Sequence, residues 1–354
     1  MTQSTEARSK LSFFGKKITQ TFIRYGLTIL IAFLLFGGIL MISGKDPIQS
    51  YNDLFTATFG SAYGFSEVIV AMIPILLTAL AVALPSRIGM INVGAEGQLF
   101  MGAIFATFGA LAFKDLSAWI LLPIMVILGV LGGAVWAFLP AYFKSIGLVN
   151  ETITTLLLNS VAPKIAGLMV YGYWHSARET NMTPSFVDAA RLPTFFGTRI
   201  HLGLVFGVVL LVIFWFVMNR TRWGLEMRAI GGNVQAAKRN GISVPTYMMV
   251  IFCIGGGIAG LAGMAQVSGF YGLLIPNFSP GYGYMGFLIS WLAAGDPFGI
   301  LLMAFAVSII LTGGNMLQIT IGLPYAVINL LLAFTLFIVL ARPSLPIFRK
   351  GKTA

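Results

Sequence analysis

Two clusters of polar side chains stand out in a chain that is 58% apolar and only 9% charged. Asn92, Glu96 and Gln98 form the first, and Thr152, Thr155 and Asn159 form the second. The second cluster has i, i+3, i+7 spacing, which places its members on one face of a helix. Amide, hydroxyl and carboxylate groups offer hydrogen bonds, either to a neighbouring helix or to a polar solute.

Both uses of the clusters have to be weighed. Asn92 can cap a helix whose first turn holds Glu96, and this structural interpretation is as good as a role in a solute pathway. A polar stripe on the helix of Asn159 either bonds other helices or lines a wet path, and we favour the path. The six residues are therefore the candidate pathway residues.

Signatures of catalysis are missing from the sequence. It contains no GxxxxGK[ST] phosphate loop, no HExxH and no GxSxG. Its two histidines, His175 and His201, fall in or beside one loop, and the single Cys253 lies in an apolar run. We expect no enzymatic activity, no cofactor and no metal site. Carboxylates are concentrated at the ends of apolar runs, which counts against the main alternative class, an ion-coupled secondary transporter.

Apolar runs of about 20 residues, each long enough to cross a membrane of about 30 Å, recur along almost the whole chain. This pattern predicts an all-α, polytopic membrane protein. We place spans at 26–43, 67–84, 95–113, 117–138, 151–173, 200–218, 247–268, 282–295, 299–316 and 323–341. The eighth is the shortest and is interpreted as a half-helix that enters partway. Lys164 is the one cation deep in a span. It would snorkel outward or pair with a loop acid, and a role with substrate is the less favoured alternative.

Charge predicts the orientation of these ten spans. The net charge of +11 comes from basic residues at span ends, which contact anionic lipid headgroups rather than nucleic acid. Basic residues cluster before residue 26, between Arg220 and Pro245, and after residue 341. The positive-inside rule puts these three regions in the cytoplasm. Even numbers of spans separate them, so the assignment is consistent with both termini inside.

Two irregular segments lead into short spans, at Gly89–Gly97 (GMINVGAEG) and at Ile275–Gly283 (IPNFSPGYG). Interrupted segments at corresponding positions of two oppositely oriented halves indicate an inverted repeat with a path between the halves. Small residues at spacings of four, such as Gly129 and Gly133 or Gly256 and Gly260, predict close helix packing within the chain.

The segment Arg220–Pro245 contains signals for two short helices. The first covers Leu225–Ile230, and Gly231 and Gly232 would end it. Asn233 is a good N-cap for a second helix over Val234–Asn240, with Gly241 as the residue that ends it. Such helices anchor at the membrane surface or form a docking site for a cytosolic partner.

Three stretches resemble one family: Gly89–Gly102 (GMINVGAEGQLFMG), Asn150–Asn159 (NETITTLLLN) and Gly224–Gly241 (GLEMRAIGGNVQAAKRNG). They are similar to permease subunits of bacterial ABC importers of the branched-chain amino acid, ribose and nucleoside group. The nearest resemblance is to the longer permease of nucleoside importers that use basic membrane lipoproteins.

The resemblance implies a fold similar to cobalamin-type permeases and a location in the bacterial inner or plasma membrane. It also implies three partners: a second, related permease, a cytosolic ATPase with two nucleotide-binding domains in one chain, and an extracytoplasmic binding lipoprotein. Nucleosides are the implied substrates, with ribose, other simple sugars or branched-chain amino acids as alternatives. The implied ATPase contact includes Glu226, Arg228, Gly231, Gly232, Asn233, Ala236, Ala237 and Gly241.

These inferences divide the chain into three parts. Residues 1–25 form a basic cytoplasmic segment, 26–341 the transmembrane permease domain, and 342–354 a cytoplasmic tail. Within the domain, 220–245 is the coupling loop, whereas 44–66 and 174–199 are extracytoplasmic loops.

Overall fold

The computed structural model describes residues 34–176 and 181–322, together with seven positions between 324 and 334. Over this part the regular secondary structure is helical, the helices are joined by turns and irregular loops, and one isolated bridge pairs Thr194 with His201. Seven of the described helices are long and apolar enough to cross a membrane. They are α3 (Ala62–Ser86), α4 (Ala95–Ala112), α5 (Ala118–Ser145), α6 with η1 (Glu151–Tyr173), α7 (Gly203–Arg220), α10 with η3 (Val244–Tyr271) and α12 (Pro297–Ile321). The prediction of an all-α polytopic membrane protein is confirmed.

The remaining three predicted spans differ from these seven. The span at 26–43 is described only from residue 34, where it is helical to residue 42, and most of 323–341 lies outside the described residues. The eighth is α11 (Tyr282–Leu292), an 11-residue helix. At 1.5 Å per residue it is about 16 Å long, roughly half of a hydrocarbon core. The expected half-helix is therefore present.

The described residues form two compact units, one made of the parts before Phe59 and after Ile309, the other of Phe59–Ile309. The first unit contains α2 (Pro47–Phe59), a helix inside what the sequence predicted to be a plain loop at 44–66. Asp46 caps it, with Oδ1 accepting from the N–H of Ile48 at 2.8 Å. The dipeptide Asp46-Pro47 is a local signal for a helix start, which the reading by hydropathy did not use. Asp296-Pro297 starts α12 in the same way.

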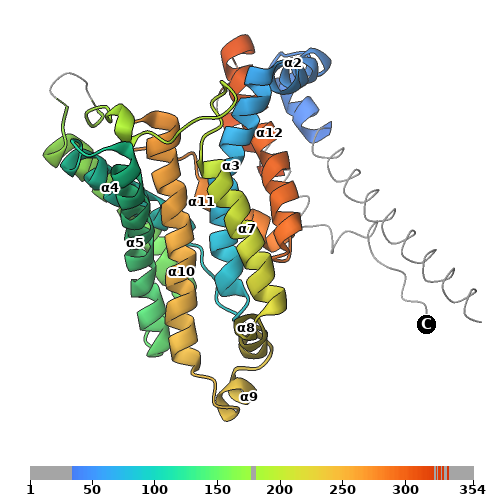
Figure 1. Ribbon diagram of the computed structural model, residues 1–354. Coiled ribbons are helices and arrows are strands. Elements are labelled where there is room, and N and C mark those ends of the chain that lie inside the picture. The colour runs from blue at the N-terminus through green and yellow to red at the C-terminus, as the bar shows by residue number, and fades with distance from the viewer. Residues whose placement is uncertain are drawn as a thin grey trace, which may run out of the picture. The chain divides into compact units, whose positions relative to one another are not determined.

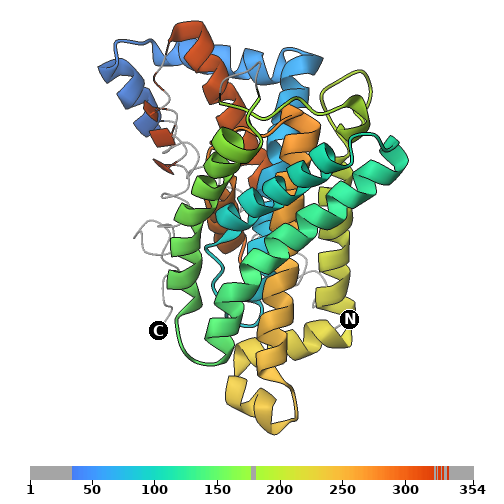
Figure 2. The same cartoon turned by 90° about the vertical axis from the view of Figure 1, so that its left-hand side faces the viewer.

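Helix α10 is central to the second unit and packs on α3, α4 and α5 (Figures 1 and 2). Glycines make this packing close. A Cβ atom added to Gly133 of α5 would lie 2.1 Å from the carbonyl oxygen of Gly256, and one on Gly102 would lie 2.2 Å from Cα of Gly260. Backbones are thus in direct contact, as the spacing of four predicted.

Two of the long helices end in π-helical turns. Residues Met169–Tyr173 (η1) continue α6, and Gln266–Tyr271 (η3) continue α10. Gly272 follows η3 in a left-handed conformation, with φ of 70°. The chain then runs irregularly to the start of α11.

At the opposite end of α10 the chain forms α8 (Arg222–Gly232) and α9 (Val234–Arg239), which lie beyond the ends of α7 and α10 in Figure 1. The prediction that Gly231 and Gly232 would end the first helix is wrong, because α8 includes both. Asn233 separates the helices instead, with φ of −157° and ψ of 106°. Its side chain caps α9, accepting from the N–H of Ala236 at 3.0 Å, and Gly241 follows α9 with φ of 81°, both as predicted.

Candidate functional site

The two irregular segments meet where α4 and α11 begin. Oε2 of Glu96, in the first turn of α4, accepts a hydrogen bond of 2.6 Å from the backbone N–H of Gly283 in the first turn of α11. A Cβ atom on Gly283 would lie 2.1 Å from the backbone nitrogen of Glu96, so only glycine fits there. Two helix N-termini, each partly positive, therefore share one buried carboxylate. We call this contact the α4–α11 junction.

The junction lies within the depth of a membrane span. Oγ1 of Thr78 donates to the carbonyl oxygen of Tyr282 at 3.0 Å. Thr78 precedes Ser86, the last residue of α3, by two turns, which corresponds to about 12 Å along the helix. Irregular backbone at such depth is tolerated only where protein buries it or a wet cavity adjoins it.

Asn92 and Gln98 form a closed pair beside the junction. Each donates to the other from its amide nitrogen, at 3.0 and 3.1 Å, and both are fully buried. Oδ1 of Asn92 also accepts from the N–H of Gly94. Asn92 is not the cap of α4, however. Gly94 occupies the N-cap position, so Asn92 stabilises the turn that precedes it.

The polar residues of α6 (Glu151–Leu168) reach the same segment. Oδ1 of Asn159 accepts from the N–H of Gly97 at 2.8 Å, and Nδ2 donates to the carbonyl oxygen of Val93 at 2.8 Å. Thr155 is buried beside Gly94, whereas Thr152 is partly exposed. The structure thus brings five of the six candidate pathway residues into one buried cluster, with Thr152 at its edge.

Sequence reasoning missed Glu151, which belongs to the same helix face. Its side chain is buried and pairs with Lys144 at 2.7 Å, and Oε1 lies 3.4 Å from the N–H of Ile91. Spacing carried a signal, since Glu151, Thr155 and Asn159 follow each other at intervals of four. Lys164 lies on the exposed side of α6.

A cavity of about 430 Å³ adjoins the irregular segment after α3. It is lined by Ser86, Gly89, Met90 and Ile91 on one side, and by Ser290, Trp291, Ala294 and Gly295 on the other. The second set forms the last turn of α11 and the turn after it. The cavity therefore lies between the end of α3 and the end of α11.

Residues of the predicted coupling loop divide into two groups. Glu226 and Arg228 hold α8 in place: the carboxylate of Glu226 pairs with Arg222 at 2.7 Å and accepts from the hydroxyl of Tyr247, and Arg228 donates to the carbonyl oxygen of Met218. The Tyr247 hydrogen bond, followed by that of Arg222, lowers the pKa of Glu226. Ala237 is buried as well.

The second group faces outward. Gly232, Asn233, Ala236 and Gly241 are exposed, although Asn233 is engaged as the cap of α9. Gly231 is exposed on one side and contacts the chain on the other, since its Cβ position lies 2.4 Å from the carbonyl oxygen of Arg87. An exposed strip on α9 beside a firmly held α8 suits a protein docking surface.

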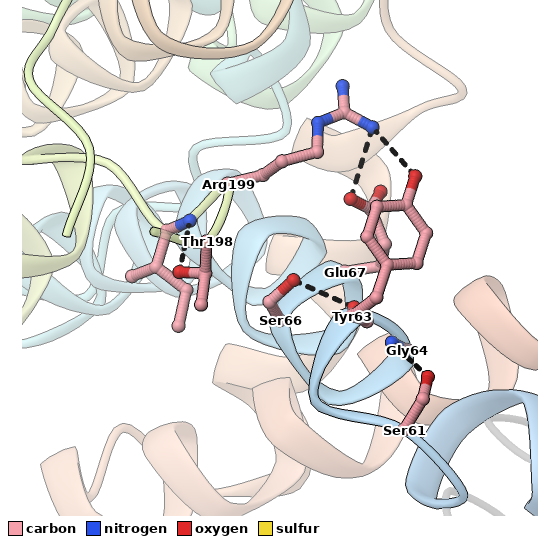
Figure 3. A network of polar contacts seen from close by, with 8 residues as sticks. Ser61, Tyr63, Gly64, Ser66, Glu67, Thr198 and Arg199 are labelled. Atoms are coloured by element: carbon pink, nitrogen blue, oxygen red, sulfur yellow. Dashed lines mark hydrogen bonds and ion pairs between the residues drawn. The ribbon is translucent and has the colours of Figure 1, made fainter. Parts of the chain in front are cut away.

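At the other end of α7 a loop is fastened by Arg199 (Figure 3). Its Nη1 pairs with Oε1 of Glu67 at 3.1 Å and approaches the hydroxyl of Tyr63 at 3.4 Å, while the guanidinium covers the ring of Phe270 at 4.7 Å. His201 is fully buried next to this network. Burial, together with Arg199, lowers the pKa of His201 to about 4.

Comparison with known proteins identifies the chain. The family model described as "Branched-chain amino acid transport system / permease component" matches residues 64–341. The chain belongs to this family. The match covers α3 to α12, including the α4–α11 junction and the loop that carries α8 and α9.

Individual relatives span nearly the whole permease. A glucose ABC transporter permease protein of Haloferax volcanii is 31% identical, covering 95% of this chain and 92% of the relative. A nucleoside ABC transporter permease protein of Lactococcus lactis is 28% identical over 88% of this chain and 89% of its own. A guanosine ABC transporter permease protein of Bacillus subtilis is 30% identical over 85% and 88%. The chain is thus an integral membrane permease component, and its role is transport rather than catalysis.

Proposed function

We propose that this chain is a transmembrane subunit of an ATP-driven uptake system that imports nucleosides. Two of the three relatives above are named for nucleosides or guanosine. The structural observation that supports the proposal is the α8–α9 segment, which leaves the membrane helices between α7 and α10 and keeps an exposed strip on α9. The permease lacks a phosphate loop of its own, so a separate ATPase has to supply the energy.

The assembly that we propose has four kinds of component. This permease pairs with a second, related permease, and a cytosolic ATPase with two nucleotide-binding domains docks on 220–245. An extracytoplasmic lipoprotein delivers the ligand to the loops at 44–66 and 174–199. The chain crosses the bacterial plasma membrane ten times with both termini in the cytoplasm, and its inverted halves resemble cobalamin-type permeases.

We also propose that the polar cluster at the α4–α11 junction belongs to the wall of the substrate path. Thr152, at its edge, is partly exposed, and the five buried residues fix the backbone behind it. This division predicts that Thr152 affects substrate affinity, while Asn92, Glu96, Gln98, Thr155 and Asn159 affect whether the path forms.

Glucose is the second candidate substrate, because the Haloferax relative is named for it. Both ligand classes present a ring with several hydroxyl groups, which amide and hydroxyl side chains can recognise. Uptake of radiolabelled uridine in a deletion strain carrying the intact system separates them. We expect unlabelled adenosine or guanosine to compete, and glucose, ribose and leucine not to. Competition by glucose alone would overturn the nucleoside proposal.

The docking surface is tested by Ala236→Asp. Ala236 is exposed on α9, and an acid near a helix N-terminus is compatible with the helix. We therefore expect normal membrane insertion but loss of ATPase binding and of uptake, whereas Lys114→Met, in an exposed turn before α5, leaves both intact. Normal uptake with Ala236→Asp would remove α9 from the interface.

A further inference from the structure

Arg87 is the residue at which the proposed coupling segment meets the half-helix α11. It follows α3 directly and precedes the irregular segment that leads to Glu96. Its side chain is neither fully buried nor fully exposed. The functions assigned so far do not use it, although it touches three different parts of the second unit.

The contacts of Arg87 point in two directions. Nη2 donates to the carbonyl oxygen of Gly295, in the turn after α11, at 2.5 Å. The guanidinium also lies 5.7 Å from the ring centroid of Phe214 on α7. On the backbone side, the carbonyl oxygen of Arg87 lies 2.4 Å from where a Cβ atom of Gly231 would be, so α8 rests directly on Arg87.

With these contacts, both ends of α11 are held by side chains of the 78–96 region. Its first turn is held by Glu96 through Gly283 and by Thr78 through Tyr282, and its far end is held by Arg87 through Gly295. At both ends a side chain from the 78–96 region binds the backbone of α11 or the turn after it. The cavity of about 430 Å³ lies between the end of α11 and the end of α3, which leaves this end of α11 room to move.

We propose that Arg87 is a positioning residue that ties the cytoplasmic end of α11 to the end of α3 on which α8 rests, so that displacement of α8 by the ATPase moves Arg87 and, with it, the end of α11. This inference rests on the proposed function, because it assumes that an ATPase docks at α8 and α9. Coupling between distant sites requires an element that has two arrangements, and here that element is α11. The guanidinium serves as the mechanical link and does not contact substrate.

The test measures the accessibility of a residue in the cavity rather than transport. Trp291 lines it and is half exposed, so Trp291→Cys in a Cys253→Ser background places a thiol at the moving end of α11. The complete transporter is reconstituted in inside-out vesicles, and the rate of reaction with a membrane-impermeant maleimide is measured with and without Mg-ATP. We expect ATP to change the rate several-fold with Arg87 present.

Variants then test whether the contacts of Arg87 carry this ATP-dependent change. Arg87→Met should abolish the ATP-dependent change, and Arg87→Lys, which keeps one donor for Gly295, should restore part of it. Gly231→Ala forces α8 away from Arg87 without altering a charge, and should also weaken the response, while Lys114→Met should not. A response that survives in both Arg87→Met and Gly231→Ala, or that is missing with Arg87 intact, would overturn the inference. ATP-dependent release of radiolabelled uridine, enclosed in the same vesicles together with the binding lipoprotein, tests the proposed function separately, because an importer moves solute out of inside-out vesicles.

Discussion

Glu96 and Gly283 are 187 positions apart in the chain, yet a hydrogen bond of 2.6 Å joins the carboxylate of one to the backbone N–H of the other. The bond connects the first turns of α4 and α11 inside the membrane-spanning part of the permease. It satisfies one of the N–H groups that every helix start leaves without an intrahelical partner. In a membrane interior no water can accept a hydrogen bond from this N–H group, so loss of the bond costs more stability there than at a surface.

Glu96→Ala should therefore lower stability by about 1–3 kcal/mol, the usual cost of a buried donor left without a partner. Glu96→Gln keeps an acceptor oxygen and should lose less. Thermal unfolding of the purified permease in detergent measures both, and equal midpoints for wild type and Glu96→Ala would contradict the assignment.

The glycine contacts between α5 and α10 give a second prediction. Gly133→Ala places a methyl group 2.1 Å from the carbonyl oxygen of Gly256, so the two backbones have to separate. We expect a sharp fall in folded protein, measured as the monodisperse fraction in size-exclusion chromatography. Gly167→Ala is the matched control, because its nearest neighbour is 3.6 Å away and alanine suits a helix. A similar loss in both variants would show that glycine itself, rather than close packing, is required.

Asn159 should be required for the segment between α3 and α4. Asn159→Ala leaves both the N–H of Gly97 and the carbonyl of Val93 without their partner, and about 1–3 kcal/mol of stability should be lost. Ser160→Ala, at the exposed neighbouring position, should change stability by less than about 0.5 kcal/mol. Chemical unfolding in mixed micelles compares the two. Equal effects would mean that the amide of Asn159 does not hold this segment.

His201 predicts a pH dependence. Its pKa falls from 6.5 in the unfolded chain to about 4 in the folded one, so the unfolded state binds the proton more readily. Stability from this group is fully present above pH 6.5 and is lost as the pH falls toward 4, by up to about 3 kcal/mol. Unfolding midpoints at pH 7 and pH 5 should differ more for wild type than for His201→Asn, whose amide oxygen can replace Nδ1 as acceptor for Gly203. An identical pH dependence in the two proteins would show that another group titrates.

Local patterns predicted much of the fold. The apolar runs placed the starts of α4 and α6 at residues 95 and 151, where the structure has them. The glycine spacing predicted close packing of helices, which the structure shows between α5 and α10, and Asn233 predicted the cap of α9. Each of these features depends on residues within a few turns of one another, or on one period repeated along one helix.

The features that were missed depend on distant contacts. Arg87 has no local signal beyond a positive charge at the end of a span, because its partner Gly295 contributes only a backbone oxygen. Gly231 reads as a helix breaker in isolation, yet it lies within α8 because the carbonyl of Arg87 leaves no room for a side chain. The clustering of Asn92, Gln98 and Asn159 likewise required knowing which helices are neighbours.

The π-helical turns at the C-terminal ends of α6 and α10 bear on how relatives are aligned with this chain. A π-turn bonds each N–H to the carbonyl five residues earlier, so it accommodates one residue more than an α-turn does. A relative with a single-residue deletion inside 169–173 or 266–271 can lose the wide turn and keep every other helix position unchanged. An alignment gap at either of these two places therefore indicates a change from a π-turn to an α-turn. The residues on either side of the gap still correspond to each other in the two proteins.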